Sequence, residues 1–250
     1  MKIKTYLINL DDSTERLCQA SQQLQAAGVS FERVPAFDGR NIQVADIKEY
    51  DEKASVSYMG RGLKGGELGC YFSHVACVER FLASDADYAM VLEDDMTAPD
   101  TLLASVTEIL RYTENQAISW YLMNIGANKH KISTLLRRFA SHILYKAHYF
   151  PMTTTGIIWS RQGAEAFWHY TQTHAVFCPV DNFFRYWLTD NNKGLSVYPP
   201  LTPPSGADSD INYPVAKKTN GRNRHPLYGL IKQRRLWGDK LKALRHKYLK

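Results

Sequence analysis

Three consecutive carboxylates, Glu93, Asp94 and Asp95, directly follow the apolar run 88–92. A continuous apolar run of this length is typical of a strand that is buried on both faces. Ligands of open α/β sheets bind beyond the carboxyl ends of such strands. Because clustered carboxylates raise one another's pKa unless a cation neutralises them, the cluster favours a bound metal ion. Oxygen ligands suit Mn²⁺ or Mg²⁺, which can also hold a diphosphate.

The spacing of the three acids separates their predicted roles. If the strand continues through them, Glu93 and Asp95 point to one side and Asp94 to the other. We therefore predict Glu93 and Asp95 as metal ligands and place Asp95 among the catalytic residues. A solvated acidic loop at the end of a strand is the alternative interpretation.

The N-terminal segments predict the sheet that holds these acids. Residues 4–10 form a short apolar strand, and Asp12-Ser13-Thr14-Glu15 is typical of a helix start. Gly28 stands where this helix needs a C-cap, and residues 29–34 alternate like a second strand. Strand, helix and strand in this order predict a right-handed βαβ unit and a parallel sheet.

The rest of the chain continues this alternation. Five glycines between residues 60 and 69 predict a mobile loop that leads into a helix ending near residue 82, and we expect this loop to close over a ligand. Residues 126–146 and 201–226 are predicted as polar connections. The other predicted helices are 100–112, 160–168 and 180–188, and the other predicted strands are 88–92, 118–125, 155–159 and 195–198.

Between residues 3 and 200 the chain contains a series of different short motifs. In order along the chain they are Tyr6-Leu7-Ile8-Asn9-Leu10 with Arg16, Pro35-Ala36-Phe37-Asp38-Gly39, Gly66-Glu67-Leu68-Gly69-Cys70 with Ser73-His74, Val91-Leu92-Glu93-Asp94-Asp95, Thr155-Gly156-Ile157-Ile158-Trp159 and Pro179-Val180-Asp181. As a set they resemble glycosyltransferase family 25, which contains lipopolysaccharide and lipooligosaccharide galactosyltransferases and their collagen-modifying relatives. The resemblance implies an α/β, GT-A-like fold with a Rossmann-like, mostly parallel sheet flanked by helices. It also implies a nucleotide-sugar donor, a divalent metal ion and a glycan acceptor. We therefore predict residues 1–216 as the catalytic domain.

Residues at the ends of the first two strands are assigned to the donor nucleotide. Asn9, Leu10 and Arg16 follow the first strand, and the guanidinium of Arg16 can pair with a phosphate. A solvated helix residue is the alternative for Arg16. Asp38 and Gly39 form a turn after the second strand, where the acid accepts hydrogen bonds from a base or a ribose; a plain Asx-turn is the alternative.

Four more residues complete the predicted donor site. Glu67, Ser73 and His74 lie near the start of one helix, and Asp94 joins them from the acidic cluster. Glu67 has a second interpretation as an acid that the helix dipole favours. His74 is either a donor to phosphate or sugar or a buried, hydrogen-bonded histidine.

Transfer of a sugar also needs a base for the acceptor hydroxyl. Asp181 precedes an aromatic stretch that can lie against a sugar and raise the pKa of the carboxyl, so we predict Asp181 as this base. An N-cap of the following helix is the alternative. In GT-A enzymes a later loop often supplies a third metal ligand, and His225 is the candidate here.

Charge is uneven along the chain. The net charge is +6, but residues 217–250 hold twelve Lys or Arg and one Asp, which leaves the preceding part acidic. Apolar residues recur there at three- or four-residue spacing, from Leu227 to Tyr248. We predict that this tail, residues 217–250, is a basic amphipathic helix on the anionic inner leaflet of a membrane. A helix docked on its own domain and a nucleic-acid-binding helix are the alternatives.

Composition excludes several other classes of protein. The 250 residues are 44% hydrophobic and 22% charged, which is ordinary for a globular protein, and no apolar run is long enough for a membrane span. The four cysteines lack metal-site spacing and are expected to be reduced thiols. Because the N-terminus does not resemble a signal peptide, we expect a cytoplasmic protein that is peripherally associated with the inner membrane and does not bind nucleic acid.

Together these features predict a metal-dependent galactosyltransferase that moves galactose from UDP-galactose to a lipid-linked lipooligosaccharide or lipopolysaccharide acceptor, with inversion. The sugar, the acceptor and the inversion come from the resemblance. A metal-dependent phosphoesterase or nucleotidyltransferase is one rival, because such enzymes also use clustered acids. A non-catalytic glycan-binding module at the membrane surface is the other.

Overall fold

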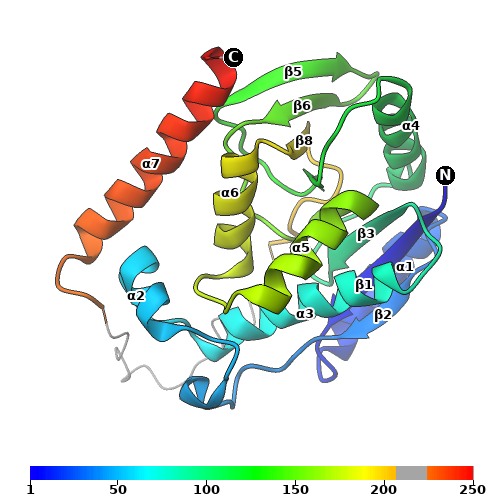
Figure 1. Cartoon of the computed structure of the whole chain (residues 1–250). Coiled ribbons are helices and arrows are strands. Elements are labelled where there is room, and N and C mark those ends of the chain that lie inside the picture. The colour runs from blue at the N-terminus through cyan, green and yellow to red at the C-terminus, as the bar shows by residue number, and fades with distance from the viewer. Residues whose placement is uncertain (207–223, 250) are drawn as a thin grey trace.

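Helices and strands alternate along most of the chain in the computed structural model, which describes residues 1–206 and 224–249. The helices lie on both faces of one eight-stranded sheet of order β2-β1-β3-β7-β4-β8-β6-β5 (Figure 1). In chain order the elements are β1 (Ile3–Asn9), α1 (Thr14–Ala26), β2 (Glu32–Pro35), the 3₁₀ turn η1 (Val44–Asp46), α2 (Glu52–Met59), α3 (Gly65–Leu82), β3 (Tyr88–Glu93), α4 (Leu102–Asn115), β4 (Leu122–Asn124), β5 (Ser133–Arg138), β6 (Ile143–Ala147), β7 (Gly156–Ser160), α5 (Arg161–Thr173), α6 (Val180–Asn191), β8 (Gly194–Tyr198) and α7 (Tyr228–Tyr248).

The predicted βαβ beginning of the fold is confirmed. Strand β1 pairs in parallel with β2 and with β3, and α1 connects β1 to β2. Gly28 has a φ of +67°, a left-handed conformation that glycine adopts readily after a helix. Ser13 is the N-cap of α1, although its side chain makes no capping hydrogen bond among the described residues. The predicted capping motif therefore contributes less than its sequence suggests.

The sheet is mixed, so the prediction of a mostly parallel sheet is wrong. Among the described strands, three pairs are parallel and four are antiparallel. Strand β7 runs against both β3 and β4, and β6 runs against both β8 and β5, with which it forms a hairpin at one edge of the sheet. Residues 126–146 are predicted as a polar connection, but they contain β5 and most of β6. Strand β5 is largely exposed at the sheet edge, so it has no apolar alternation by which a sequence pattern reveals a strand.

Two apolar layers cover the two faces of the sheet. On one face α3, α5 and α6 pack a cluster that includes Phe81, Phe167 and Phe183; on the other face α1 and α4 bury Leu24 and Leu110. The α/β architecture with a central sheet between helices is thereby confirmed. The four cysteines are free thiols, of which Cys18 is exposed.

The glycine-rich segment differs from the predicted mobile loop. Helix α2 precedes it and ends at Gly60, whose φ of +74° suits a glycine C-cap. Helix α3 already begins at Gly65, so residues 60–64 are only a short connection between two helices. The Leu63 N–H donates to the Tyr50 hydroxyl across 2.9 Å, which ties this connection to the preceding segment.

Helix α7 is confirmed as a helix, and it lies along one side of the molecule against α2 and α6 (Figure 1). The start of the predicted tail, residues 217–223, and its boundary with the catalytic domain lie outside the described residues. Among the helices that are described, none combines the length and the apolar character needed to cross a membrane.

Candidate active site

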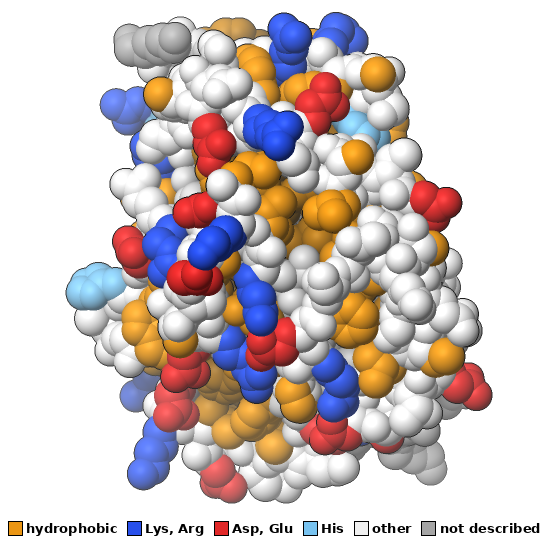
Figure 2. Space-filling model, turned by 90° about the vertical axis from the view of Figure 1, so that its right-hand side faces the viewer, with side chains coloured by type: hydrophobic (Ala, Val, Ile, Leu, Met, Phe, Trp, Pro, Cys, Tyr) orange, Lys and Arg blue, Asp and Glu red, His pale blue; other side chains and the backbone are white. Residues whose placement is uncertain are grey.

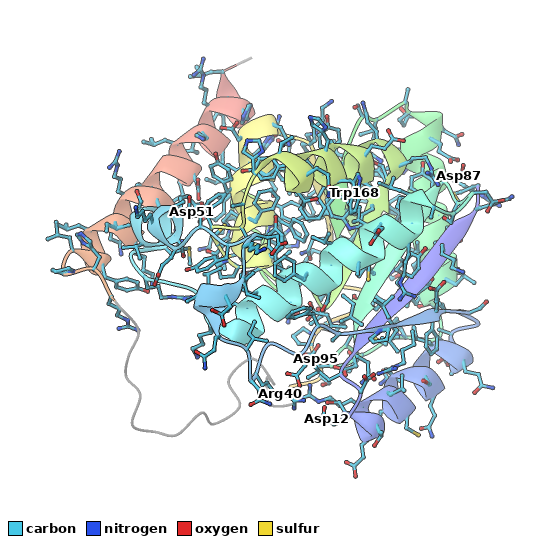
Figure 3. The ribbon with its side chains drawn as sticks, turned by 60° about the horizontal axis from the view of Figure 1, so that its bottom comes forward. Asp12, Arg40, Asp51, Asp87, Asp95 and Trp168 are labelled. Carbon is cyan, nitrogen blue, oxygen red and sulfur yellow. The ribbon has the colours of Figure 1, made fainter. Side chains whose placement is uncertain are left out.

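A pocket opens at the carboxyl ends of β1 and β3, where the sequence places its acidic cluster. Figure 3 shows Asp95, Arg40 and Asp12 together at this end of the sheet, with Asp87 at the opposite end. The pocket is open to solvent and has a volume of about 110 Å³. The lining residues are Ile8, Asn9, Leu10, Arg16, Ala36, Phe37, Asp38, Gly39, Arg40, Gly66, Cys70, Ser73, Glu93, Asp94 and Asp95. The fold thus brings together most of the predicted donor-binding residues and all three acids.

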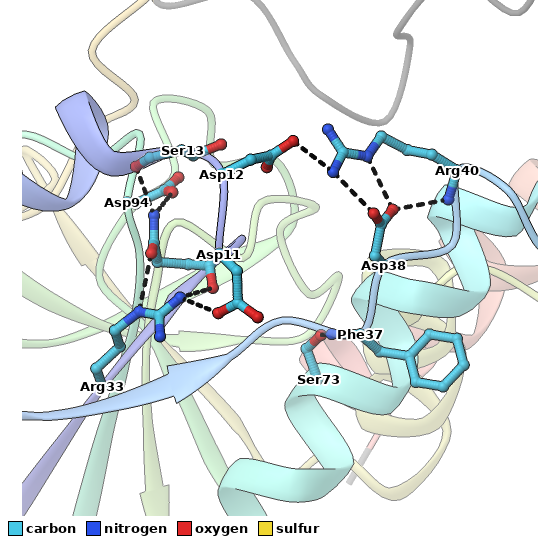
Figure 4. A network of polar contacts seen from close by, with 10 residues as sticks. Asp11, Asp12, Ser13, Arg33, Phe37, Asp38, Arg40, Ser73 and Asp94 are labelled. Carbon is cyan, nitrogen blue, oxygen red and sulfur yellow. Dashed lines mark hydrogen bonds and ion pairs between the residues drawn. The ribbon is translucent and has the colours of Figure 1, made fainter.

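Asp94 lies in a network that joins the ends of β1 and β3 (Figure 4). The Asn9 side-chain amide donates to Asp94 across 2.7 Å, and the Arg16 guanidinium lies 3.6 Å from the same carboxylate. On its other side, Asn9 accepts from Arg33 Nε at 2.9 Å. Asp94 and Arg16 therefore meet at the pocket wall as an ion pair within the chain.

Glu93 faces helix α3 and does not point into open solvent. The fully buried His74 donates from Nε2 to Glu93 Oε1 across 3.0 Å, and the Cys70 thiol lies 3.8 Å from the same oxygen. Burial by itself would raise the pKa of Glu93, but the hydrogen bonds from His74, Thr154 and Cys70 lower it. His74 is thus the buried, hydrogen-bonded histidine of the alternative interpretation, because its contact is to Glu93. The prediction had assigned it to phosphate or sugar.

Cys70, His74 and Glu93 also form a group of side chains that could hold a metal ion, with ligand atoms all within 4.8 Å of one another. Cys70 was not predicted as a site residue, although its spacing of four from His74 on a helix could have indicated the pair. Burial raises the pKa of the Cys70 thiol well above its usual value. The neutral thiol and His74 therefore hold the Glu93 carboxylate in one orientation.

Asp95 is the acid whose surroundings best fit a cation. Strand β3 ends at Glu93 and residues 94–95 form a turn, so the alternation assumed for Glu93 and Asp95 does not apply. Asp95 Oδ1 is buried and has no hydrogen-bond partner among the described residues. Burial, together with the charges of Glu93 and Asp94, raises the pKa of Asp95 to about 6. A cation bound beside Asp95 would neutralise these charges, so the residues present fit a metal ion.

Small residues of α3 let the loop after β2 lie directly on the helix. A Cβ atom on Gly39 would come within 1.9 Å of the Gly65 carbonyl oxygen, and one on Gly69 would come within 2.3 Å of the Phe37 carbonyl oxygen. One turn further on, the Ser73 hydroxyl accepts from the Phe37 N–H at 2.9 Å. Gly39 and Ser73, both predicted to bind donor, therefore also shape the pocket wall through packing.

Arg40 is a pocket residue that the sequence prediction missed. Its guanidinium donates to Asp38 at 2.8 and 2.7 Å and pairs with Asp12 at 2.7 Å. The Arg40 N–H also donates to Asp38 at 3.0 Å, which is the Asx-turn geometry of the alternative interpretation. These hydrogen bonds lower the pKa of Asp38. The position of Arg40 directly after Asp38-Gly39 was the signal by which it could have been found.

Like His74, which contacts Glu93 from behind the pocket lining, the predicted site residues Glu67, His225 and Asp181 do not line this pocket. Glu67 accepts from Arg61 at 2.8 and 2.5 Å and from the Lys64 N–H at 2.8 Å, so it serves the start of α3. His225 lies beside α2, where its N–H donates to the Gly60 carbonyl oxygen at 2.9 Å. The structure does not bring His225 to the acids, which corrects its prediction as a third metal ligand.

Asp181 occupies the first turn of α6, behind the acidic pocket. Its carboxylate accepts from the backbone and side chain of Asn182 at 2.6 and 2.9 Å, and Pro179 is the N-cap of the helix, so Asp181 is not the N-cap. Burial raises the pKa of Asp181. Its charge acts on both Cys70, which lines the acidic pocket, and Arg185, which follows one turn later on α6.

Comparison with known proteins shows which family the chain is similar to. The family model described as "Glycosyltransferase family 25 (LPS biosynthesis protein)" matches residues 2–184. The chain is 23% identical over 185 residues to "Procollagen galactosyltransferase 1" of Danio rerio, covering 72% of this chain and 30% of that protein. It is 26% identical over 127 residues to "Probable inactive glycosyltransferase 25 family member 3" of Rattus norvegicus, covering 49% and 22%. The chain thus spans less than a third of the length of these relatives.

A solved structure of "a glycosyltransferase involved in the glycosylation of the major capsid of PBCV-1" aligns with a TM-score of 0.42 at 9% identity. The alignment covers 84% of this chain and 95% of that one. At this TM-score the structural similarity carries no information about the residues of the site.

Proposed function

The chain belongs to glycosyltransferase family 25, and we propose that it transfers galactose from UDP-galactose to a lipooligosaccharide or lipopolysaccharide acceptor, with Mn²⁺ or Mg²⁺ and with inversion at the anomeric carbon. The observation that carries the proposal is the pocket at the ends of β1 and β3, where Asp95 and two further acids lie beside Arg16 and Arg40. Acids that bind a cation, next to guanidinium groups, suit a diphosphate. We therefore assign this pocket to the diphosphate of the donor.

Asp95 is the residue that would hold the metal ion, because its buried Oδ1 lacks a partner among the described residues. Glu93 remains the candidate second ligand, held in place by His74. A metal ion bound there would neutralise negative charge on the leaving diphosphate. Arg16, which also pairs with Asp94, is placed to contact the same phosphates.

Asp181 is the proposed base. It takes the proton of the acceptor hydroxyl while the hydroxyl oxygen bonds to the anomeric carbon and the bond from that carbon to the diphosphate breaks. Burial raises the pKa of this carboxyl, which makes it a stronger base than an exposed aspartate. One base and no covalent nucleophile are consistent with inversion.

We also propose that α7 binds the anionic cytoplasmic surface of the inner membrane. The helix buries Asp239 and Ala243 against the domain, while Leu230, Trp237 and Leu241 are 68%, 58% and 62% exposed. Helix α7 therefore docks on its own domain and still presents an apolar stripe flanked by Lys and Arg. The face in Figure 2, the right-hand side of Figure 1, instead shows acidic and basic side chains interspersed. The apolar stripe of α7 with its flanking Lys and Arg side chains suits a membrane surface of anionic lipid.

Cosedimentation with vesicles tests the membrane proposal. The full chain is expected to bind vesicles that contain anionic lipid, less so as salt rises, because each base near the surface contributes about 1 kcal/mol. Trp237→Ser with Leu241→Ser should abolish this binding, whereas Leu135→Ser, at an exposed residue of β5, should not. Equal binding to neutral vesicles, or a dimer that the double variant dissociates, would contradict the proposal.

A panel of nucleotide-sugars tests the transfer reaction. With a lipooligosaccharide acceptor and Mn²⁺, UDP-galactose should release UDP faster than the other donors, and EDTA should stop the release. Inorganic phosphate or pyrophosphate as the product would favour the phosphoesterase or nucleotidyltransferase rival. Glycan binding without any turnover, unaffected by Asp95→Ala, would favour a non-catalytic module, a possibility in keeping with the relative that is named as inactive.

A further inference from the structure

A second cavity, of about 330 Å³, lies at the carboxyl end of β4. Because β7 runs antiparallel to both β3 and β4, these two strands run in the same direction and end at the same edge of the sheet. The cavity therefore opens on the edge that carries the acidic pocket. Its lining residues are Ala127, Asn128, Lys129, Lys131, Tyr149, Pro151, Met152, Thr153 and Arg185, which we call the basic pocket.

The charges of the basic pocket are all positive. Its described lining includes Lys129, Lys131 and Arg185 and no carboxylate, and none of the three cations forms an ion pair with an acid of the described residues. Arg185 is fixed, since its Nε donates to the Phe150 carbonyl oxygen at 2.8 Å and its guanidinium lies 4.4 Å from the centre of the Tyr149 ring. Lys131 Nζ lies 5.9 Å from the same ring. Arg185 is partly buried, whereas Lys129 and Lys131 are exposed at the mouth of the cavity. A partly buried guanidinium without an ion-pair partner leaves a place for an anion.

The backbone around the basic pocket is also held in place. The buried Asn124 donates to the Thr153 carbonyl oxygen at 2.7 Å. The other side of the same amide accepts from Gly126 and Ala127 at 3.1 and 2.9 Å. One side chain thus joins the two segments that form the walls of the pocket.

The basic pocket adjoins the proposed base. Arg185 follows Asp181 by one turn of α6, so the two side chains lie on the same face of the helix, and the charge of Asp181 acts on Arg185. From Thr153 the chain continues to Thr155, whose carbonyl oxygen accepts from the Glu93 N–H at 3.1 Å. Asp181 therefore lies one helical turn from Arg185 of the basic pocket, and its charge also acts on Cys70 of the acidic pocket.

We propose that the basic pocket binds an anionic group, a phosphate or a carboxylate, carried by the acceptor sugar. This inference rests on the proposed function, since it identifies the acceptor as an acidic glycan. A guanidinium and two ammonium groups around one cavity recognise such an oxyanion, whichever of the two sugar substituents supplies it. A neutral sugar gains nothing from these charges.

Binding of three probes tests the inference without requiring turnover. In calorimetry on the full chain with UDP and Mn²⁺ present, glucose 6-phosphate or glucuronate should bind, and methyl glucoside should bind at least about tenfold more weakly. Comparison of the two acidic probes identifies which anion the pocket prefers. If neither acidic probe binds while UDP is present, or if both bind no better than methyl glucoside, the inference is overturned.

Variants locate the binding. Lys131→Ala should weaken the preferred acidic probe by about fivefold, and Lys131→Glu should abolish its binding, with methyl glucoside unaffected. Lys53→Ala, at an exposed lysine of α2, should leave both unchanged. Lys131 is exposed, so these changes should not disturb folding. Binding that depends on Lys131 in a chain without transferase activity would refute the proposed function only, whereas transfer with binding indifferent to Lys131 would refute the basic pocket only.

Discussion

The acidic pocket and the basic pocket lie at the same edge of the sheet, but they differ in whether their charged side chains have partners within the chain. In the acidic pocket, Asp94 is paired with Arg16, and Glu93 is held by His74. In the basic pocket, Lys129 and Lys131 have no acidic partner among the described residues. One pocket is organised by contacts within the chain, and the other presents its charge outward.

From this difference we infer separate roles for the two pockets, catalysis for the acidic pocket and recognition of the acceptor for the basic pocket. A network of internal contacts fixes positions before a ligand arrives, which suits the reacting centre. Charges without internal partners contribute mainly when an oppositely charged ligand binds, which suits recognition of one acceptor among many. Asp95, with its unpartnered oxygen, is the exception within the acidic pocket and is therefore the residue that we connect to the metal ion.

Substitution of Asp95 should produce the largest effect. Asp95→Asn removes the charge that would hold the cation, so turnover should fall by about 10³-fold or more. The melting temperature should not fall, because the substitution also removes a buried charge. Asp12→Asn, which alters only the outer partner of Arg40, should change the rate of UDP release by less than about threefold. Similar losses in both variants would show that the pocket rim, and not Asp95, carries the effect.

Asp181 lies one helical turn before Arg185 of the basic pocket, and its substitution separates chemistry from binding. Asp181→Asn should reduce kcat by about 10²–10⁴-fold with little change in the KM for donor or acceptor. The measurement is steady-state kinetics with each substrate varied. An unchanged kcat would show that Asp181 is not the base and serves only through its hydrogen bonds at the start of α6.

The internal order of the acidic pocket should depend on His74. His74→Ala leaves Glu93 buried without its donor and opens a cavity, so the free energy of unfolding should fall by about 3 kcal/mol. Urea denaturation measures the loss. His74→Gln, which can still donate to Glu93, should recover most of it, and His225→Ala, at an exposed ring, should change stability by less than about 0.5 kcal/mol. Equal losses in the Ala and Gln variants would show that packing alone holds His74.

The wall formed by α3 and the loop after β2 should be sensitive to a single methyl group. Gly39→Ala places a Cβ against the Gly65 carbonyl oxygen, where only 1.9 Å is available, and should destabilise the fold by about 2 kcal/mol. In α7, Gly238→Ala meets nothing within 4 Å and should stabilise by about 0.5–1 kcal/mol. Thermal unfolding of both variants tests the contrast. Tolerance of Gly39→Ala would indicate that the loop can shift.

The sequence predicted the location of the acidic pocket better than its contacts. Strand ends place Asn9 and Asp95 together because buried parallel strands are readable from apolar runs. The orientation of Glu93 was not readable, since it depends on where β3 stops and on which side chain of α3 stands opposite. Gly39 and Gly65 were assigned to a ligand site and a mobile loop, because a sequence does not reveal close approaches between distant segments.

The basic pocket was not predicted at all. Lys129 and Lys131 are seen in the sequence as ordinary surface residues, and Arg185 follows them by more than fifty positions. Only the return of the chain from β4 through the β5–β6 hairpin to α6 brings them together. In α7 the apolar spacing predicted the helix and, in the membrane interpretation, a stripe that faces away from the domain. It did not indicate that Asp239 and Ala243 would be buried against the domain at the same time.

The central claim is that a cation binds beside Asp95 and holds a diphosphate. Anomalous diffraction at the manganese edge, from crystals soaked with MnCl₂ and UDP, tests it most directly. We expect one peak in contact with Asp95 Oδ1 and with the diphosphate. A peak bonded instead to Cys70 and His74, or UDP bound with no peak near Asp95, would contradict the account.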